Sequence, residues 1–212
     1  MALISISEQN GLNLLRNDDI KILSIGISTG GQAELKMLEG NPERYVVATT
    51  IDEEGLEYTK KLLRGNNRIE AKLEDVSSPM PYQDEFFDFI YARLVLHYLD
   101  DASLANALAE LYRVLKKDGR IFVVVKSVDD FVRKRAGAVH FPETGLTRTP
   151  RPNGSVSFRR FHTQETIETA LKTAGFEMVY TKEYKERLFS DFMRTNMNDE
   201  DASLIECLGV RK

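Results

Sequence analysis

The chain has 212 residues, of which 42% are hydrophobic and 29% are charged, and its formal net charge at pH 7 is −4. This length allows one well-buried domain and is short for two. No apolar run approaches the roughly 20 residues of a membrane helix, and the first residues lack the features of a secretory signal. We therefore expect one domain over residues 1–212, in a cytoplasmic protein with no membrane segment.

Cysteine and histidine are scarce. Cys207 is the single cysteine, which excludes an intramolecular disulfide, and the three histidines are scattered along the chain. Neither residue type shows the spacing of a zinc site. We expect no bound metal, and we expect Cys207 to be a buried strand residue.

A basic segment lies in the second half of the chain. Residues 126–162 contain eight Lys or Arg and three Asp or Glu, so this segment carries +5 and the rest of the chain −9. Such an island could face an anionic substrate, and a solvated loop is the alternative. The segment is rich in Gly, Pro, Thr and Arg without clear periodicity, which predicts a functional or mobile loop insertion at about 127–160.

A glycine-containing stretch, KILSIGISTGG, occupies residues 21–31. An apolar run breaks at Gly26, small residues follow, and a helix-like segment continues over residues 32–38. This order is typical of a nucleotide-binding loop, because glycine lets a ligand approach the backbone and the following helix supplies free N–H groups. The alternative is an ordinary strand-to-helix turn.

Apolar and helical patterns alternate along the first 125 residues. We expect strands over residues 21–25, 45–51, 68–73, 86–92 and 121–125, and later over 176–181 and 204–210. We expect helices over residues 4–16, 32–38, 53–63, 102–117 and 163–174, with Asp101 and Thr163 as N-caps of the last two. The alternation predicts an α/β, doubly wound sheet.

Four ordered stretches resemble the class I S-adenosylmethionine-dependent methyltransferases of the type 11/25-like group. They are PMPYQDEFFD (79–88), FFDFIYARLVLHYLDD (86–101), LYRVLKKDGRIFVVV (111–125) and FHTQETIETALKTAGFE (161–177). The resemblance covers residues 21–125 and, more loosely, 161–212. It implies a Rossmann-like, seven-stranded, mostly parallel sheet with an antiparallel last strand, and S-adenosyl-L-methionine as cofactor.

The resemblance also implies where the cofactor binds. The glycine loop would lie under the methionine half of the cofactor, and the end of the second strand would hold the ribose. The end of the third strand would lie at the adenine, and the end of the fourth strand at the methyl group. The candidates are Gly26, Ser28, Gly30, Thr50, Ile51, Asp52, Asp75, Val76, Ala92 and Arg93.

Three positions depart from the family pattern. The family usually has an acid where Ser24 stands, a glycine where Ser28 stands and an acid where Thr50 stands. Charge-assisted hydrogen bonds are worth about 1.5–3 kcal/mol, so two such losses could weaken binding about a hundredfold. If the second strand continues past Thr50, Asp52 or Glu53 could take the ribose instead.

Methyl transfer needs alignment of the reacting atoms, and a general base only where the acceptor must lose a proton. The catalytic candidates are His97, Tyr91 and Arg93, for which packing is the alternative role. The substrate candidates are His140, Arg159, Arg160 and His162, which could clasp a carboxylate or phosphate, with solvent exposure as the alternative.

The sequence thus predicts an S-adenosylmethionine-dependent methyltransferase that acts on a small molecule, which could be anionic. A non-catalytic or regulatory protein of the same fold, with weakened cofactor binding, is one alternative. An RNA methyltransferase is disfavoured, because aromatic and basic residues are not interleaved, and a nicotinamide-dependent oxidoreductase is disfavoured by the four stretches above. The sequence does not indicate an oligomeric state.

Overall fold

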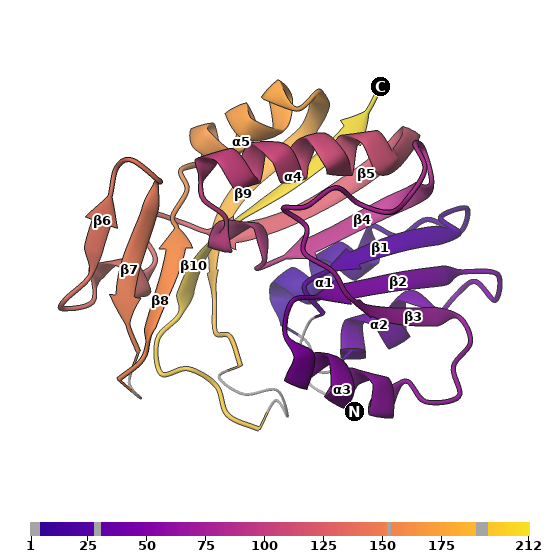
Figure 1. Ribbon diagram of the computed structural model, residues 1–212, viewed down its shortest axis with the longest axis horizontal. Helices are drawn as coiled ribbons and strands as arrows, with labels where there is room; N and C mark the ends of the chain where they lie inside the picture. The colour runs from indigo at the N-terminus through magenta and orange to yellow at the C-terminus, as the bar shows by residue number, and fades with distance from the viewer. Residues whose placement is uncertain (1–4, 28–30, 152–153, 190–194) are drawn as a thin grey trace.

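A seven-stranded sheet runs through the molecule (Figure 1), in a computed structural model that describes residues 5–27, 31–151, 154–189 and 195–212. The strand order is β3-β2-β1-β4-β5-β10-β9. The strands are β1 (Lys21–Ile25), β2 (Tyr45–Thr50), β3 (Ile69–Leu73), β4 (Phe87–Arg93), β5 (Leu115–Lys126), β9 (Phe176–Glu186) and β10 (Ala202–Arg211). Only β10 of these seven runs antiparallel to its neighbours, which confirms the predicted sheet.

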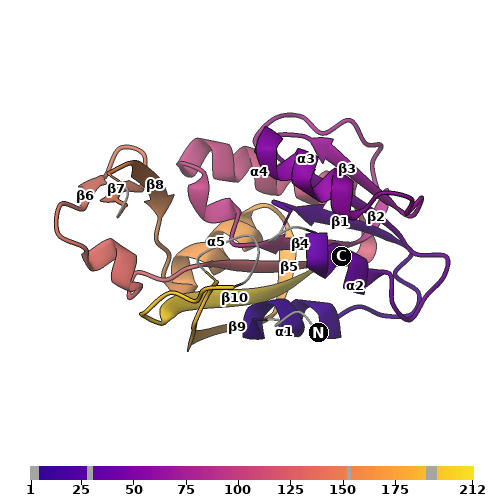
Figure 2. The ribbon, with the colours of Figure 1, turned by 90° about the horizontal axis from the view of Figure 1, so that it is seen from below.

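Helices cover both faces of the sheet (Figures 1 and 2). They are α1 (Ile6–Asn13), α2 (Gln32–Met37), α3 (Glu53–Leu62), α4 (Asp101–Val114) and α5 (Gln164–Thr173). The apolar residues of α4 and α5, such as Leu108 and Ile167, form one buried cluster with the sheet. Met37 of α2, with Leu63 just after α3, belongs to a second cluster on the other face. The result is a three-layer α/β architecture.

The element boundaries differ from the sequence expectation mainly around α4. Its N-cap is Asp100, whose side chain accepts from the Ser103 N–H at 2.8 Å, rather than Asp101. The helix ends at Val114, not at Lys117, because β5 already begins at Leu115. An irregular β4–β5 register and a left-handed Asp118 (φ +59°) accommodate the early start of the strand.

Other boundaries also differ from the expected ones. The first helix is shorter than residues 4–16, and β2 ends at Thr50 rather than Ile51. In contrast, β9 extends to Glu186, five residues beyond the expected end. Its polar outer half is held in the sheet because it pairs with β10 up to the Glu186–Ala202 position. Long-range pairing therefore overrode the local pattern.

Residues 127–160 do not form the loop that the sequence predicts. After a 3₁₀ turn, η3 (Phe131–Lys134), this segment forms a separate antiparallel sheet of β6 (Val139–Phe141), β7 (Leu146–Pro150) and β8 (Val156–Arg160). Figures 1 and 2 show this sheet at one end of the molecule. Its strands are short, and its apolar residues Val139, Val156 and Phe158 are exposed, so the composition hid a period-two pattern.

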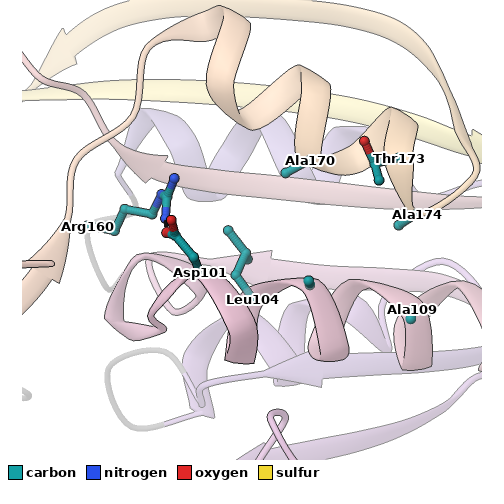
Figure 3. Close-up of a pocket in the computed structure, with 8 residues that line it drawn as sticks. Asp101, Leu104, Ala109, Arg160, Ala170, Thr173 and Ala174 are labelled. Carbon is teal, nitrogen blue, oxygen red and sulfur yellow. Dashed lines mark ion pairs between the residues drawn. The ribbon is translucent and has the colours of Figure 1, made fainter. Parts of the chain in front are cut away.

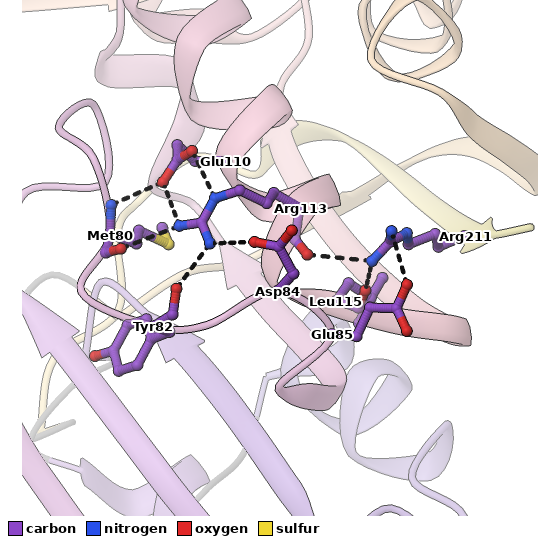
Figure 4. Close-up of polar contacts among 8 residues, drawn as sticks. All are labelled: Met80, Tyr82, Asp84, Glu85, Glu110, Arg113, Leu115 and Arg211. Atoms are coloured by element: carbon purple, nitrogen blue, oxygen red, sulfur yellow. Dashed lines mark hydrogen bonds and ion pairs between the residues drawn. The ribbon is translucent and has the colours of Figure 1, made fainter.

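The hydrogen bonds of Arg113 hold the segment between β3 and β4 in place (Figure 4). Arg113 of α4 donates to both carboxylate oxygens of Glu110, at 2.9 and 2.7 Å, and to Asp84 at 2.8 Å. It also donates to the backbone carbonyls of Tyr82 and Met80, at 2.7 and 3.0 Å. One side chain thereby holds a proline-containing segment that has no helix of its own.

Among the residues that the structure describes, no helix combines the length and the apolar character needed to cross a membrane. The same part of the chain contains no group of three or more His, Cys, Asp or Glu side chains that could hold a metal ion. Cys207 is buried in β10, as expected, and burial raises the pKa of its thiol to about 12.

Candidate cofactor and acceptor site

The carboxyl ends of β1, β2 and β3 meet at one edge of the sheet. The N–H groups of Gly26 and Ile27, which follow β1, donate to the Thr49 carbonyl at 2.8 and 2.9 Å. The Glu74 N–H, which follows β3, donates to the Thr50 carbonyl at 2.9 Å. The loops after β1 and β3 are therefore both tied to the end of β2, and ligands of open α/β sheets bind at such an edge.

Gly26 is required by the shape of this edge. Its φ is +71°, a conformation that favours glycine, and a Cβ there would lie 2.9 Å from the Cβ of Val95. The turn after β1 thus packs closely against the loop after β4. Ser28 and Gly30, the other loop candidates, lie outside the described residues.

A buried carboxylate lies beside the glycine loop. The hydroxyl of Ser24, on β1, donates to Oε1 of Glu34 at 2.7 Å, and neither residue has any exposed surface. Glu34 comes from the first turn of α2, which Gly31 starts with a φ of +77°. A carboxylate from the helix after the loop therefore lies beside position 24.

The end of β2 presents a hydroxyl and then a carboxylate. Thr50 accepts from the Asp52 N–H at 3.1 Å, and Ile51 between them is exposed. The strand does not continue to Asp52, which instead precedes the first residue of α3 with an extended backbone (φ −94°, ψ 106°). Asp52 is exposed, and its carboxylate lies over Gly55 in the first turn of that helix.

The end of β3 carries the two expected adenine-edge candidates in different environments. The Asp75 carboxylate accepts from the N–H and the hydroxyl of Ser77, at 2.9 and 2.8 Å. This closes a tight local turn that leaves Asp75 exposed. Val76 is buried in the α4–α5 cluster. The Asp75 turn and the buried Val76 side chain therefore both hold the backbone after β3 in place.

The candidates on β4 alternate between the two faces of the sheet. Ala92 is buried on the α4–α5 side, whereas the Tyr91 ring stacks on Phe122 on the α1–α2 side, with centroids 5.5 Å apart. Arg93 also engages the α1 side. Its guanidinium donates to the hydroxyls of Ser5 and Ser7, at 2.6 and 2.7 Å, and lies 3.5 Å from a carboxylate oxygen of Glu186.

His97 and His162 lie close to each other, near the carboxyl ends of β4 and β5. His97 is in a 3₁₀ turn, η2 (Leu96–Tyr98), and His162 follows β8 with its backbone N–H donating to Lys126 at 2.9 Å. Each is 1% exposed. Burial lowers the pKa of His97 well below its usual value, and the charges of Lys126 and Arg159 and the nearby His162 lower it further.

Burial also governs the protonation of His162. It lowers the pKa of this histidine to about 3, and the Arg160 charge contributes. Both histidines are consequently neutral near pH 7, so each ring carries one N–H donor and one acceptor nitrogen. Neither histidine presents a positive charge to this region.

The four substrate candidates do not lie around one common binding site. Arg159 and His162 contribute to the His97 region, but His140 is exposed and its Nδ1 lies 3.2 Å from the Thr147 hydroxyl. Arg160 forms an ion pair with Asp101. These two side chains lie at a groove of about 310 Å³ between α4 and α5, which the small side chains of Ala105, Ala109 and Ala170 help to line (Figure 3).

Sequence reasoning missed three residues near these regions. Glu34 directly follows the glycine loop, and its position in the first helical turn is the signal that could have suggested it. Lys126, at the end of β5, and Asp130, which caps the turn after it, form a buried ion pair at 2.8 Å that no helical spacing could have suggested. No sequence pattern placed this pair beside His97.

Comparison with protein-family models gives one match. The model described as a methyltransferase domain matches residues 23–123. A demethylmenaquinone methyltransferase from Lactobacillus johnsonii is 28% identical over 134 residues, which cover 59% of this chain and 54% of that protein. The match therefore spans about half the length of this curated relative.

Solved structures share the fold over nearly the whole chain. An S-adenosylmethionine-dependent methyltransferase from Methanosarcina mazei has a TM-score of 0.75 and 23% identity, with 94% of this chain and 95% of that chain covered. The cyclase SpnF has a TM-score of 0.66 and 18% identity, with 96% and 79% covered. At these identities the likeness concerns the fold.

S-adenosylmethionine carries two cationic centres, a ribose and an adenine, and the described edge of the sheet fits such a molecule. Gly26 lets the backbone turn at the end of β1, Glu34 supplies a buried carboxylate, and Thr50 with Asp52 supplies oxygen acceptors. Residues 23–123 are thus similar to the methyltransferase-domain model, and nearly the whole chain shares the fold of a solved S-adenosylmethionine-dependent methyltransferase.

Proposed function

We propose that the protein is an S-adenosylmethionine-dependent methyltransferase whose acceptor is a small molecule. The observation that carries this proposal is the meeting of the Gly26 turn, the Ser24–Glu34 pair and the end of β2 at one edge of the parallel sheet. The bound cofactor supplies an electrophilic methyl group. The chain binds both reactants and aligns them, which is the main requirement for this displacement.

The cofactor would lie along the carboxyl ends of the first four strands. In this proposal the backbone at Gly26, Ser28 and Gly30 lies under the methionine half, and Glu34 attracts its ammonium group. The other positions follow the edge of the sheet: Thr50, Ile51 and Asp52 at the ribose, Asp75 and Val76 at the adenine, and Ala92 beside the methyl group. Arg93 acts as a positioning residue, because its buried contacts join β4 to α1 and β9.

The acceptor would bind where β4 and β5 end, next to the β6–β8 sheet. A small-molecule acceptor is supported by the relative named demethylmenaquinone methyltransferase. An anionic acceptor is supported by the +5 charge of residues 126–162. In this arrangement His97 orients the acceptor by hydrogen bonding, and its lowered pKa makes it a weak base.

A second candidate function is cofactor binding without methyl transfer. It is favoured by the likeness in fold to a structure named a cyclase. The same fold hosts different reactions, so the fold alone does not decide between them. The two candidates differ in product formation rather than in cofactor affinity.

Two measurements test the proposal in sequence. Native mass spectrometry of freshly purified protein should reveal a co-purified mass of S-adenosylmethionine or S-adenosylhomocysteine, and calorimetry should give a saturable heat with each. No heat at millimolar S-adenosylhomocysteine would refute both functions. Cofactor binding without transfer of a labelled methyl group to any small molecule of a cell extract would favour the second function.

A further inference from the structure

The β6–β8 sheet turns its polar face toward the body of the protein. Thr147, Thr149 and Ser157 are buried, whereas Val156 and Phe158, which alternate with Ser157 on β8, are exposed. Arg159 lies on the polar face, because it is paired with Thr147 and donates to the Thr149 hydroxyl at 3.3 Å. Packing alone would favour the opposite arrangement, so the inward polar face needs a reason.

Several polar atoms at this face have no hydrogen-bond partner among the described residues. They are Nδ1 of His97, both ring nitrogens of His162 and Nε of Arg159, and all four atoms are buried. Buried polar groups in native proteins are nearly always paired with protein, water or ligand. The lowered pKa of His97 depends partly on Arg159 and His162, which indicates that the three side chains are close.

The charges of this region are unequal. Lys126 is neutralised by Asp130 at 2.8 Å, and Arg160 is paired with Asp101. Arg159 has no ion pair within the described part of the chain. Its guanidinium lies 5.3 Å from the centre of the Tyr98 ring. One positive charge and two neutral imidazoles therefore face a common region, and none of the carboxylates that the structure describes forms an ion pair with Arg159.

We propose that His97, His162 and Arg159 bind an acidic oxygen of the acceptor, a carboxylate or a phenolate. This inference rests on the proposed function, since it names the class of acceptor. An oxyanion accepts from the Arg159 Nε–H and from one N–H of each neutral imidazole, which pairs the unpartnered donors and balances the charge. The ligand enters beside Tyr98, which is 46% exposed.

The same residue types elsewhere in the chain provide matched controls. His140 is exposed and has Thr147 as its partner. Arg148 is exposed on β7, where its register partner is the outward-facing Phe158. A response that is specific to the proposed site must involve His162 but not His140, and Arg159 but not Arg148.

The chain has only three histidines, so their imidazole NMR signals can be assigned with His97→Gln, His140→Gln and His162→Gln variants. We use benzoate as the probe and benzamide as its uncharged counterpart, in the presence of saturating S-adenosylhomocysteine. Benzoate should shift the signals of His97 and His162 and leave that of His140 in place. Benzamide should bind at least about tenfold more weakly, because it lacks the charge.

Arg159→Gln should weaken benzoate binding about tenfold or more, whereas Arg148→Gln should leave it unchanged. Thermal unfolding of both variants establishes that they are folded. Shifts at all three histidines, equal binding of benzamide, or unaltered binding in Arg159→Gln would each overturn the inference, as would unresponsive histidines paired only with ordered water. Benzoate binding without S-adenosylhomocysteine binding would refute the proposed function but not this site, and the converse result would refute the site alone.

Discussion

The hydroxyl of Ser24 donates a 2.7 Å hydrogen bond to the carboxylate of Glu34, and both side chains are fully buried. This contact joins the strand before the glycine loop to the helix after it. The family usually has an acid at position 24, and here a carboxylate from α2 lies beside that position. The loss of cofactor affinity that the sequence implies at this position should be largely offset.

Removing the Glu34 charge should weaken cofactor binding. We expect Glu34→Gln to raise the dissociation constant of S-adenosylhomocysteine by roughly 10- to 100-fold, the equivalent of one charge-assisted contact of about 1.5–3 kcal/mol. Glu39→Gln, an exposed acid just after the same helix, is the matched control. The double variant Ser24→Asp/Glu34→Ser returns the carboxylate to β1 and should restore affinity. Unchanged binding in Glu34→Gln would remove this role.

Asp52 should contribute to ribose binding at the end of β2. Its carboxylate is exposed, so we expect Asp52→Ala to weaken S-adenosylhomocysteine binding by only about tenfold, which corresponds to about 1.4 kcal/mol. Asp52→Asn should weaken it less, because the amide keeps one acceptor. Calorimetry measures both, and an unchanged dissociation constant in Asp52→Ala would leave Thr50 as the ribose contact.

Buried neutral histidines should make the protein sensitive to mild acid. Burial lowers the pKa of His162 to about 3 in the folded state, against about 6.5 in the unfolded chain, so the unfolded chain binds more protons between these values. The free energy of unfolding should therefore fall as the pH is lowered from 6.5 towards 3. His162→Gln should reduce this slope by up to about 1.4 kcal/mol per pH unit.

Urea unfolding between pH 7 and pH 4 tests the slope. His140→Gln, at an exposed position, is the control for a generic loss of a histidine. Parallel stability curves for wild type and His162→Gln would contradict the account, because they would mean that His162 is not held neutral by the fold.

Arg113 should stabilise the segment that follows the adenine-edge residues and leads to β4. Arg113→Gln removes its hydrogen bonds to Glu110, Asp84 and two carbonyls (Figure 4). The side chain is 30% exposed, so we expect a loss of about 1–3 kcal/mol in the free energy of unfolding. Lys60→Gln breaks only the exposed Lys60–Glu57 pair and should cost less than about 0.5 kcal/mol. Equal effects of the two substitutions would contradict the assigned role.

The central sheet was predictable because its strands carry strong local signals. The run IFVVV within β5 is buried on both faces, and Thr163 caps α5 with a reciprocal side-chain contact from Thr166. The β6–β8 sheet was not predictable in the same way. Its strands are short, and Phe158 faces outward while Ser157 is buried, so the usual link between apolar character and burial is reversed.

The candidate site was only partly accessible from the sequence. The glycine turn at Gly26 can be predicted from the local order of residues. The Ser24–Glu34 contact spans ten residues, and the proximity of His97 to His162 joins residues 65 positions apart. Such relationships follow from how the strands are ordered in the sheet, and no local pattern encodes them.

A paired titration tests the central claim most directly. S-adenosylhomocysteine and NADH are each titrated into the full-length protein by calorimetry, since both ligands suit a glycine loop after a first strand. We predict one saturable site for S-adenosylhomocysteine and no specific heat with NADH. No heat with millimolar S-adenosylhomocysteine, or saturable binding of NADH, would contradict a methyltransferase cofactor site at the edge formed by Gly26, Glu34 and Thr50.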